Sequence, residues 1–358
     1  MTQTSALHKQ IQLGDITLNN RIIMAPLTRT RANGDVANEL MAEHYSQRAS
    51  AGLLIAEATA VMKDTVAFLN GPGIYSDEHV EGWKKVTDAV HAKGGKIFLQ
   101  IWHGGRASHP DLNGGVVPVA ASALAITNDE VHTAEGKKAY TVPRALETEE
   151  IPTIVDAFKQ GAIYAKQAGF DGVEVHAANG YLLDNFLRDG SNQREDQYGG
   201  SIENRARLLF EVLDAVIDVW GAGKVGLRTS PLNSFNSMLD SDPVGHTKYL
   251  AKRLNDYNLA YWHLMRADFL QQQSGDVVTP ARKIYQGNLI GNMGYSADEA
   301  EQAVANQQLD AVAFGVPFIA NPDLVERLAV NVELNEADPN TFYLGGEKGY
   351  TDYPFMNK

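Results

Sequence analysis

The sequence predicts a (β/α)8 TIM barrel, in which eight parallel strands close into a ring and helices cover the outside. Short runs rich in apolar and β-branched residues recur along the chain, and such nearly continuous runs suit parallel strands buried on both faces. Amphipathic helical patterns usually follow these runs. An open doubly wound sheet is the alternative, but it would usually place a G-x-G-x-x-G turn after its first strand, where this chain reads APLTRTRANG.

The apolar runs give the bounds of the expected strands. They lie at 21–26, 52–59, 96–103, 172–178, 224–231, 261–267, 289–294 and 311–316. Helical patterns lie at 78–93, 153–169, 203–219, 243–255, 297–306 and 323–329. The pattern at 153–169 has Pro152 near its start and Gly169 at its end, as helix termini prefer. Its apolar residues at helical spacing are Ile154, Phe158, Ala162 and Ala165.

The longest interruption of this pattern is residues 104–147, which follow the third predicted strand. Within it, EVHTAEGKKAYTV predicts a hairpin that turns at Glu135-Gly136. Loops of this length in compact domains are often lids or binding elements, so we expect this one to cover the mouth of the barrel. The whole chain, residues 1–358, is expected to form one barrel domain, since α/β barrels reach this length undivided.

Composition narrows the possible functions. The chain is 44% hydrophobic but has no stretch near the roughly 20 apolar residues that span a bilayer. The first residues, MTQTSALHKQIQLGDITL, lack the pattern of a signal peptide. A cytoplasmic protein without a membrane partner is expected. The formal charge of −13 opposes binding to nucleic acid.

The absence of cysteine removes several chemistries together. With no cysteine, the chain has no disulfide, thiolate nucleophile, cysteine-ligated zinc or all-cysteine iron–sulfur cluster. Redox chemistry would therefore use a bound organic cofactor or a metal on oxygen and nitrogen ligands, and no metal site is predicted.

Barrel active sites lie at the carboxyl ends of the strands. Gln100, at the third strand end, can donate and accept at once, which suits an imide edge. Arg228, at the fifth, suits negative charge that develops on a ring. Asn292 and Gly294, after the seventh, leave backbone N–H groups accessible to a phosphate. Together these residue types indicate a socket for flavin mononucleotide (FMN). The remaining strand-end candidates are Pro26, Leu27, Thr28, Glu57, Ala58, Thr59, Trp102, His103, Arg266 and Gly315.

The stretch GVEVHAANGY, residues 172–181, carries the candidate chemistry of the fourth strand end. His176 and Asn179 can both donate hydrogen bonds, and such a pair could polarise a carbonyl or nitro oxygen while the phenol of Tyr181 supplies a proton. Alternatively, His176 is a structural histidine and Tyr181 packs in the core. Glu174 has the same pleat parity as His176, so it could point into the barrel, where it would need a partner such as an arginine of a neighbouring strand.

Longer motifs resemble the Old Yellow Enzyme family of flavin-dependent ene-reductases. They include NNRIIMAPLTRTRA, HYSQRASAGLLIAEAT, LQIWHGGRASHP, PRALETEEIP, HAANGYLLDNF, SNQREDQYGGSIENRARLLFEV, FIANPDLVERL and GYTDYP, which together span nearly the whole chain. QYGGSIENR alone is highly specific. The likeness points to bacterial members of the N-ethylmaleimide reductase and pentaerythritol tetranitrate reductase type.

The resemblance implies a role for each candidate residue. His176 and Asn179 would bind the substrate oxygen, and Tyr181 would protonate the substrate α-carbon. Thr28 would bond the flavin O4 edge, Gln100 the pyrimidine edge, and Arg228 would balance charge near N1. Further cofactor contacts would come from Pro26, Leu27, Ala58, His176, Asn292, Gly294 and Gly315. Substrate contacts would also come from Phe68, Trp102 and Tyr353.

The implied reaction has two halves. NADPH or NADH delivers hydride to FMN and leaves, and an activated alkene then takes that hydride at its β-carbon. The expected substrates are small unsaturated carbonyl compounds, maleimides or nitro compounds. The family includes monomers and homodimers, so either state is compatible with the resemblance.

Three positions depart from the pattern of close relatives. FGVPFIANPDL has Val316 where relatives carry an arginine that contacts the FMN phosphate. We hypothesise that Arg266 compensates, with backbone amides alone as the alternative. Asn179 stands where many bacterial relatives have histidine, and Phe68 where close relatives have tyrosine. We expect the first of these two to shift substrate preference more than activity.

Two rival functions make different predictions. A barrel glycosidase would use Glu57 and Glu174 as its carboxylate pair and would be colourless. A flavoprotein that binds FMN without turnover would be yellow, but NADPH would not bleach it.

Overall fold

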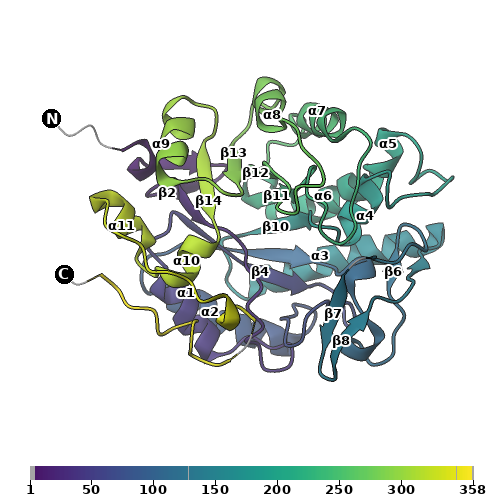
Figure 1. The fold of residues 1–358 in the computed structure, drawn as a ribbon, viewed down its shortest axis with the longest axis horizontal. Coiled ribbons are helices and arrows are strands. Elements are labelled where there is room, and N and C mark those ends of the chain that lie inside the picture. The colour runs from purple at the N-terminus through teal and green to yellow at the C-terminus, as the bar shows by residue number, and fades with distance from the viewer. Residues whose placement is uncertain (1–4, 128, 344, 357–358) are drawn as a thin grey trace.

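The computed structural model describes residues 5–127, 129–343 and 345–356. Eight parallel strands close into a barrel, and helices surround it (Figure 1). The predicted fold is therefore confirmed. In ring order, the strands are β3 (Ile22–Met24), β4 (Leu53–Ala60), β5 (Ile97–Trp102), β10 (Gly172–Ala177), β11 (Val225–Thr229), β12 (Tyr261–Met265), β13 (Leu289–Asn292) and β14 (Ala311–Phe314), which pairs with β3.

Every predicted strand coincides with a barrel strand because both faces of each strand are buried. All eight residues of β4 and all six of β10 are buried, for example. One face packs against the helices and the other fills the barrel interior, so little polar alternation remains in the sequence. The sequence therefore located the strands well.

The helices follow the predicted positions with small shifts. The predicted helices correspond to α2 (Asp77–His91), α3 (Ile151–Gln167), α5 (Ile202–Arg205) with α6 (Arg207–Trp220), α7 (Pro243–Leu254), α9 (Ala297–Ala305) and α11 (Leu324–Val330). In α3, the four residues predicted to share an apolar face are all buried. Helices not predicted are α1 (Glu39–Gln47), α4 (Leu182–Leu187), α8 (Val278–Ile284) and α10 (Val316–Ala320).

A hairpin near the N-terminus closes the bottom of the barrel. Its strands, β1 (Ile11–Leu13) and β2 (Ile16–Leu18), pair antiparallel. The backbone N–H of Asp15 donates to the carbonyl of Gly223, just before β11, over 2.9 Å. Leu13 and Leu18 pack with Phe98 and other interior side chains in one buried cluster. Because this end is closed, the carboxyl ends of the strands form the open mouth.

The predicted hairpin after the third barrel strand is present, but its turn begins one residue earlier. β7 (Glu130–Thr133) and β8 (Gly136–Ala139) pair antiparallel, with Thr133 opposite Gly136. The turn is therefore Ala134-Glu135. The Thr133 hydroxyl determines this register, because it accepts from the N–H of Glu135 over 3.2 Å and donates to the carbonyl of Gly136 over 2.8 Å.

The rest of the long loop packs beside the mouth. β6 (Val119–Ala120) pairs parallel with β9 (Arg144–Ala145). Ile126 and Tyr140 pack in a cluster with Trp102 and Tyr181, at the ends of β5 and β10. Within the described part of the chain, no helix is both long and apolar enough to cross a lipid bilayer.

Candidate active site

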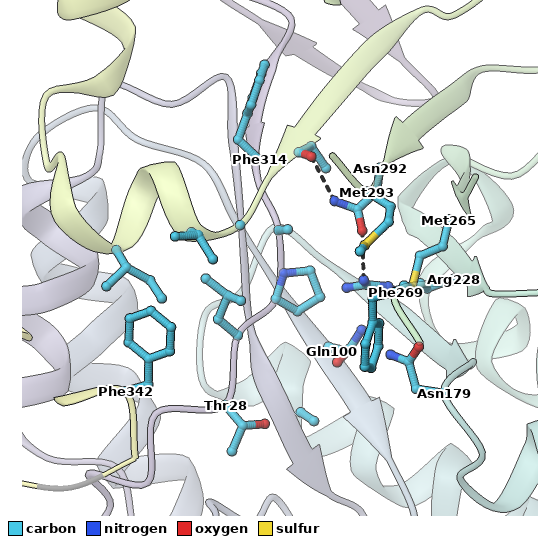
Figure 2. A pocket seen from close by; sticks show the side chains of 18 of the residues that line it. Thr28, Gln100, Asn179, Arg228, Met265, Phe269, Asn292, Met293, Phe314 and Phe342 are labelled. Carbon is cyan, nitrogen blue, oxygen red and sulfur yellow. Dashed lines mark hydrogen bonds between the residues drawn. The ribbon is translucent and has the colours of Figure 1, made fainter. Parts of the chain in front are cut away.

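A cavity of about 860 Å³ occupies the mouth of the barrel (Figure 2). Its lining brings together side chains from all eight strands or from the loops that follow them. Most of the predicted site residues are in this lining: Pro26, Leu27, Thr28, Ala58, Phe68, Gln100, His176, Asn179, Tyr181, Arg228, Asn292, Gly294 and Gly315. The fold thus gathers residues that lie up to nearly 300 positions apart in the sequence.

Two opposite sides of this cavity carry different kinds of residues. β10, which carries His176, lies directly across the ring from β14. The loops after β13 and β14 contribute Gly294, Ser296, Gly315 and Val316 to the lining. Polar donors on β10 therefore face a side that is formed by small residues and exposed backbone.

Gln100, which lines the cavity, is oriented by a buried carboxylate beneath it. The Gln100 Nε2 atom donates to Oε1 of Glu174 over 2.7 Å, and Nδ1 of His263 lies 2.8 Å from Oε2. The hydrogen-bond partners of Glu174 are therefore Gln100 on the neighbouring strand β5 and His263 on β12. The arginine expected as a partner, Arg228 on the neighbouring strand β11, interacts with Glu174 through its charge. The bond to Glu174 leaves the amide oxygen and one N–H of Gln100 available to a ligand.

Arg228 places a cation in the cavity wall. Its Nη2 donates to Oδ1 of Asn292 over 2.9 Å, and Nδ2 of Asn292 donates to the carbonyl of Ala313 over 2.8 Å (Figure 2). Burial lowers the pKa of Arg228, partly offset by the charge of Glu174. Its buried Nε has no hydrogen-bond partner among the described residues. A buried donor on a cation without an acceptor suits a ligand that carries an oxygen or nitrogen acceptor there.

These features fit a flavin. The lining contains the small or flat residues Ala25, Pro26, Ala58 and Ala313, which leave room for a planar ring system. Gln100 offers one donor and one acceptor, as an imide edge requires, and Arg228 offers a positive charge. The donor set therefore agrees with FMN as the cofactor.

His176 is a neutral donor at the cavity. Burial lowers its pKa well below the usual range, and the charges of Arg228 and His263 add to this effect. The backbone N–H of Ala178 donates to Nδ1 over 3.3 Å. Because Nδ1 is the acceptor, the single proton of the neutral ring lies on Nε2, which can donate to a ligand.

Tyr181 is a protonated phenol at the edge of the same cavity. Burial raises its pKa far above the usual range, and the nearby phenols of Tyr140 and Tyr343 raise it further. The ring meets Trp102 edge-on at 5.0 Å between centroids and His176 edge-on at 5.1 Å. This packing fixes a neutral O–H group beside His176.

Two predicted substrate contacts lie outside the cavity lining. Among the described lining residues, neither Trp102 nor Tyr353 is present. Trp102 is fully buried behind Tyr181, so it supports the wall and does not form it. Tyr353 turns away because its hydroxyl accepts from the N–H of Asp338 over 2.9 Å. Phe342 and Tyr343 line the cavity from the C-terminal segment instead.

The expected lid also lies beside the cavity: none of the described residues in 104–147 is in the lining. The mouth is instead bordered by aromatic side chains: Phe68 was expected from the sequence, whereas Phe235, Phe269 and Tyr343 were not. Phe235 and Phe269 pack at 5.6 Å between centroids, and Tyr343 stacks parallel to Phe68 at 6.5 Å. Phe235 and Phe269 follow β11 and β12, so their position after a predicted strand was the one available signal.

The region around Val316 offers backbone and small polar groups. Val316 is half exposed and lines the cavity with Met293, Gly294 and Ser296. Arg266 is not among the described lining residues. Its guanidinium donates to the carbonyls of Met293 over 2.9 Å and Gly294 over 2.8 Å. It thus supports the loop after β13 from behind.

The structure does not support the glycosidase alternative, because its two carboxylates, Glu57 and Glu174, do not line the cavity. Glu57 accepts hydrogen bonds from the backbone N–H of Arg29 and the hydroxyl of Tyr45, and neither Glu57 nor Glu174 is among the described lining residues. Burial raises the pKa of Glu57 to about 7. This carboxyl is a structural group between the barrel and α1.

A closed parallel barrel, with a cavity at its mouth whose hydrogen-bonding groups fit a flavin, defines a flavin-dependent oxidoreductase of the barrel class. Residues 6–335 match the NADH:flavin oxidoreductase / NADH oxidase family, and the chain belongs to that family. A probable flavin mononucleotide-dependent alkene reductase of Leishmania infantum is 50% identical over 97% of each chain.

Solved structures agree with this assignment. Morphinone reductase in complex with tetrahydroNAD superposes with a TM-score of 0.94, at 47% identity over 98% of both chains. The old yellow enzyme from Trypanosoma cruzi superposes with a TM-score of 0.95, at 45% identity over 98% of this chain and 99% of that one. The predicted family, the barrel fold and an FMN-dependent oxidoreductase supplied by NAD(P)H are thereby confirmed.

Proposed function

We propose that the protein reduces the carbon–carbon double bond of small electrophilic alkenes, such as unsaturated carbonyl compounds, maleimides and nitroalkenes, with NADPH or NADH as the electron source. One observation carries the proposal: His176, Asn179 and Tyr181 line one side of a cavity whose floor suits FMN. The relatives named as alkene and morphinone reductases support the same reaction.

The cofactor would be held by residues of seven strand ends. Gln100 would bond the pyrimidine edge, Arg228 would lie near N1, and Thr28 would bond the O4 edge. Pro26, Leu27, Ala58 and His176 would line the ring. Asn292, Gly294 and Gly315 would lie along the phosphate-bearing chain. Bound FMN supplies the hydride, which it first receives from the nicotinamide.

The chain contributes to the chemical step by binding charge. When a hydride reaches the β-carbon of an unsaturated carbonyl compound, negative charge moves to the carbonyl oxygen. Neutral donors at His176 Nε2 and Asn179 Nδ2 bind that oxygen more tightly as its charge grows, which lowers the barrier. The low pKa of His176 matters here, because the imidazole remains a donor without carrying its own charge.

Tyr181 would complete the reaction. Its phenol would give its proton to the α-carbon, so that the double bond gains one hydride and one proton. The raised pKa of Tyr181 keeps the proton on the phenol in the resting state. Its proton would then be replaced from solvent through the open mouth. Phe68 would form the facing wall of the substrate site, with Trp102 behind it.

An anaerobic titration tests this function. NADPH or NADH should bleach the flavin band of the purified protein, and 2-cyclohexenone should then restore it. The saturated ketone should appear in an amount equal to the NAD(P)H consumed. Bleaching without recovery would remove the alkene reductase proposal and leave the cofactor in place. A protein that NAD(P)H fails to bleach would match the alternative of FMN binding without turnover.

A further inference from the structure

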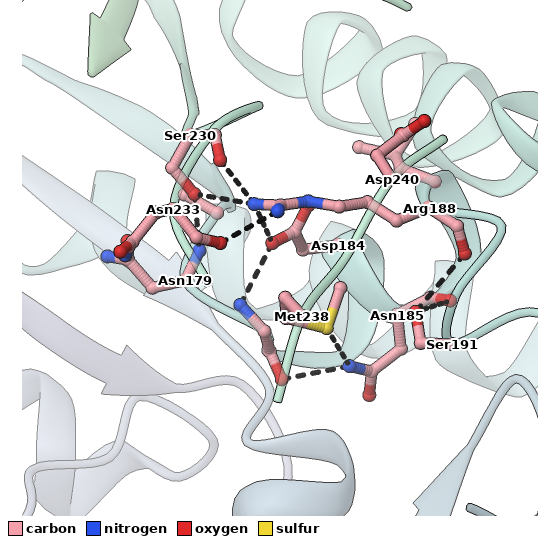
Figure 3. Close-up of polar contacts among 12 residues, drawn as sticks. Asn179, Asp184, Asn185, Arg188, Ser191, Ser230, Asn233, Met238 and Asp240 are labelled. Carbon is pink, nitrogen blue, oxygen red and sulfur yellow. Dashed lines mark hydrogen bonds and ion pairs between the residues drawn. The ribbon is translucent and has the colours of Figure 1, made fainter. Parts of the chain in front are cut away.

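A hydrogen-bond network outside the cavity ties Asn179 to the loop after β11 (Figure 3). The Asn233 Nδ2 atom donates to Oδ1 of Asn179 over 2.8 Å. The backbone N–H of Asn179 donates to Oγ of Ser230 over 2.7 Å, and Nδ2 of Asn236 donates to the backbone carbonyl of Asn179 over 2.8 Å. Asn179 thus has one contact to its side chain and two to its backbone.

A buried ion pair holds this loop. Arg188 and Asp184, four residues apart and both almost fully buried, are joined at 3.0 Å. Nη1 of Arg188 donates to the carbonyl of Asn233 over 2.7 Å, and Nη2 donates to the carbonyl of Ser230. Since every one of these groups is buried, the backbone around Asn233 has little freedom to move.

The backbone at Asn179 also needs support. Its φ of +58° lies in the left-handed region, which asparagine tolerates better than most residues. The next residue, Gly180, donates its N–H to Asp184 over 2.9 Å. The same ion pair therefore holds the peptide on both sides of the candidate substrate-binding amide.

The direction of the bond between the two side chains decides what Asn179 offers the cavity. Because Oδ1 accepts from Asn233, the Nδ2 donor is left for a ligand, and Figure 2 shows this nitrogen on the side of Gln100. The reversed arrangement would bury the Asn233 amide nitrogen without an acceptor. In the observed arrangement, the Asn233 Oδ1 lacks a partner among the described residues. A buried carbonyl oxygen without a donor costs less free energy than a buried N–H without an acceptor.

We propose that Asn233 is a positioning residue that orients the carboxamide of Asn179 so that its N–H, and not its oxygen, faces the substrate. Asn233 is fully buried and is not among the described residues that line the cavity, so it acts through Asn179. This inference rests on the proposed function, because it assumes that Asn179 binds the oxygen of the substrate.

An isosteric change tests the orientation. In Asn233→Asp, the carboxylate can only accept, so Nδ2 of Asn179 should turn toward it and Oδ1 should face the cavity. The holoenzyme is titrated with 4-hydroxybenzaldehyde, whose phenolate oxygen mimics the charged substrate oxygen, and binding is followed by the charge-transfer band of the phenolate stacked on the flavin. We expect the Kd to rise about 30-fold or more and the band to weaken. FMN affinity should stay within about twofold.

Three further variants separate the possible causes. Asn233→Ala removes the bond without reversing it, so it should raise the Kd only severalfold. Asn179→Ala should weaken binding, and adding Asn233→Asp to Asn179→Ala should change little more. Asn20→Asp is the matched control: Asn20 is buried and its Nδ2 donates to the carbonyl of Ser50 over 2.9 Å, far from the mouth. It should leave the Kd unchanged.

The outcomes distinguish the two proposals. If Asn179→Ala leaves the Kd unchanged, the role of Asn179 in the proposed function fails, and this inference fails with it. If Asn179→Ala weakens binding but neither Asn233 variant does, only the inference is overturned. An equal effect of Asn233→Asp with and without Asn179, or an equal effect of Asn233→Ala and Asn233→Asp, would also overturn it. If Asn233→Asp does not fold, the cycle with Asn233→Ala still tests the coupling.

Discussion

The side chain of Gln100 donates to Glu174 over 2.7 Å, so a carboxylate in the barrel interior determines which edge of the Gln100 amide faces the cavity. Glu174 is fully buried, and His263 bonds its second oxygen. A residue that touches no ligand thus helps to shape the socket for the pyrimidine edge of the flavin.

Glu174→Gln should therefore weaken cofactor binding. The new amide can donate as well as accept, so it no longer imposes one orientation on Gln100. We expect the Kd for FMN to rise about tenfold, consistent with one buried hydrogen bond of roughly 1–2 kcal/mol. The binding of riboflavin should weaken by the same factor, since Gln100 contacts the flavin ring and not the phosphate. Quenching of flavin fluorescence measures both, and Glu57→Gln is the control, because Glu57 is a buried carboxyl outside the lining. Unchanged affinity in Glu174→Gln would refute the orienting role.

Tyr181→Phe should separate the two halves of the reaction. Flavin reduction by NADPH needs no proton from the phenol and should keep its rate within a few-fold. Reduction of 2-cyclohexenone should slow by about 10²–10⁴, the range of general acid catalysis. Anaerobic stopped-flow absorbance measures each half separately. Ferricyanide, which accepts electrons without protonation at carbon, serves as the control acceptor and should oxidise both proteins alike. An unchanged rate with 2-cyclohexenone would exclude Tyr181 as the proton donor.

Val316→Arg should strengthen the contact with the FMN phosphate. Val316 is half exposed at the side of the cavity opposite β10, where Arg266 is already bonded to backbone carbonyls. A new guanidinium there should lower the Kd for FMN about fivefold at low salt, about 1 kcal/mol, and less at high salt. Riboflavin lacks the phosphate and should bind as before. An equal increase in the affinity for riboflavin would show that position 316 does not face the phosphate.

His103 makes the fold sensitive to acid. Burial lowers its pKa to about 4, whereas an unfolded histidine titrates near 6.5. Between these values the unfolded chain binds more protons, so this contribution to stability falls as the pH falls. The loss should reach on the order of 2 kcal/mol at pH 5.

His103→Asn keeps an acceptor for the N–H of Gly105, which bonds Nδ1 over 3.0 Å, but it does not titrate. As the pH falls from 7.5 to 5, the parent should therefore lose on the order of 2 kcal/mol of unfolding free energy that the variant keeps. Chemical denaturation at each pH measures it. A difference that is constant with pH would show that His103 is not buried as a neutral group.

The strands and most of the cavity could be predicted because each depends on short stretches of chain. Parallel strands buried on both faces leave continuous apolar runs, and the residues near the carboxyl end of each run lie at the mouth in any such barrel. Gln100, His176 and Arg228 follow directly from that rule. The hairpin β1–β2, by contrast, consists of two strands of three residues each, too short for a periodic signal.

The contribution of the C-terminal segment could not be predicted in the same way. Phe342 and Tyr343 reach the cavity because Nε of Arg29 donates to the carbonyl of Phe342 over 3.0 Å and the hydroxyl of Thr30 donates to that of Tyr343 over 2.5 Å. These bonds join segments more than 300 residues apart and use main-chain carbonyls, which any sequence supplies. The motif GYTDYP predicts a role for Tyr353, but Phe342 and Tyr343, which precede this motif, form the cavity wall.

A crystal structure of the holoenzyme with bound 4-hydroxybenzaldehyde tests the central claim most directly. We predict a planar FMN ring in the mouth of the barrel, with Gln100 on its pyrimidine edge and Arg228 near N1. The phenolate oxygen should lie within hydrogen-bonding distance of both His176 Nε2 and Asn179 Nδ2. A flavin bound elsewhere, or a ligand oxygen that points away from β10, would contradict the account.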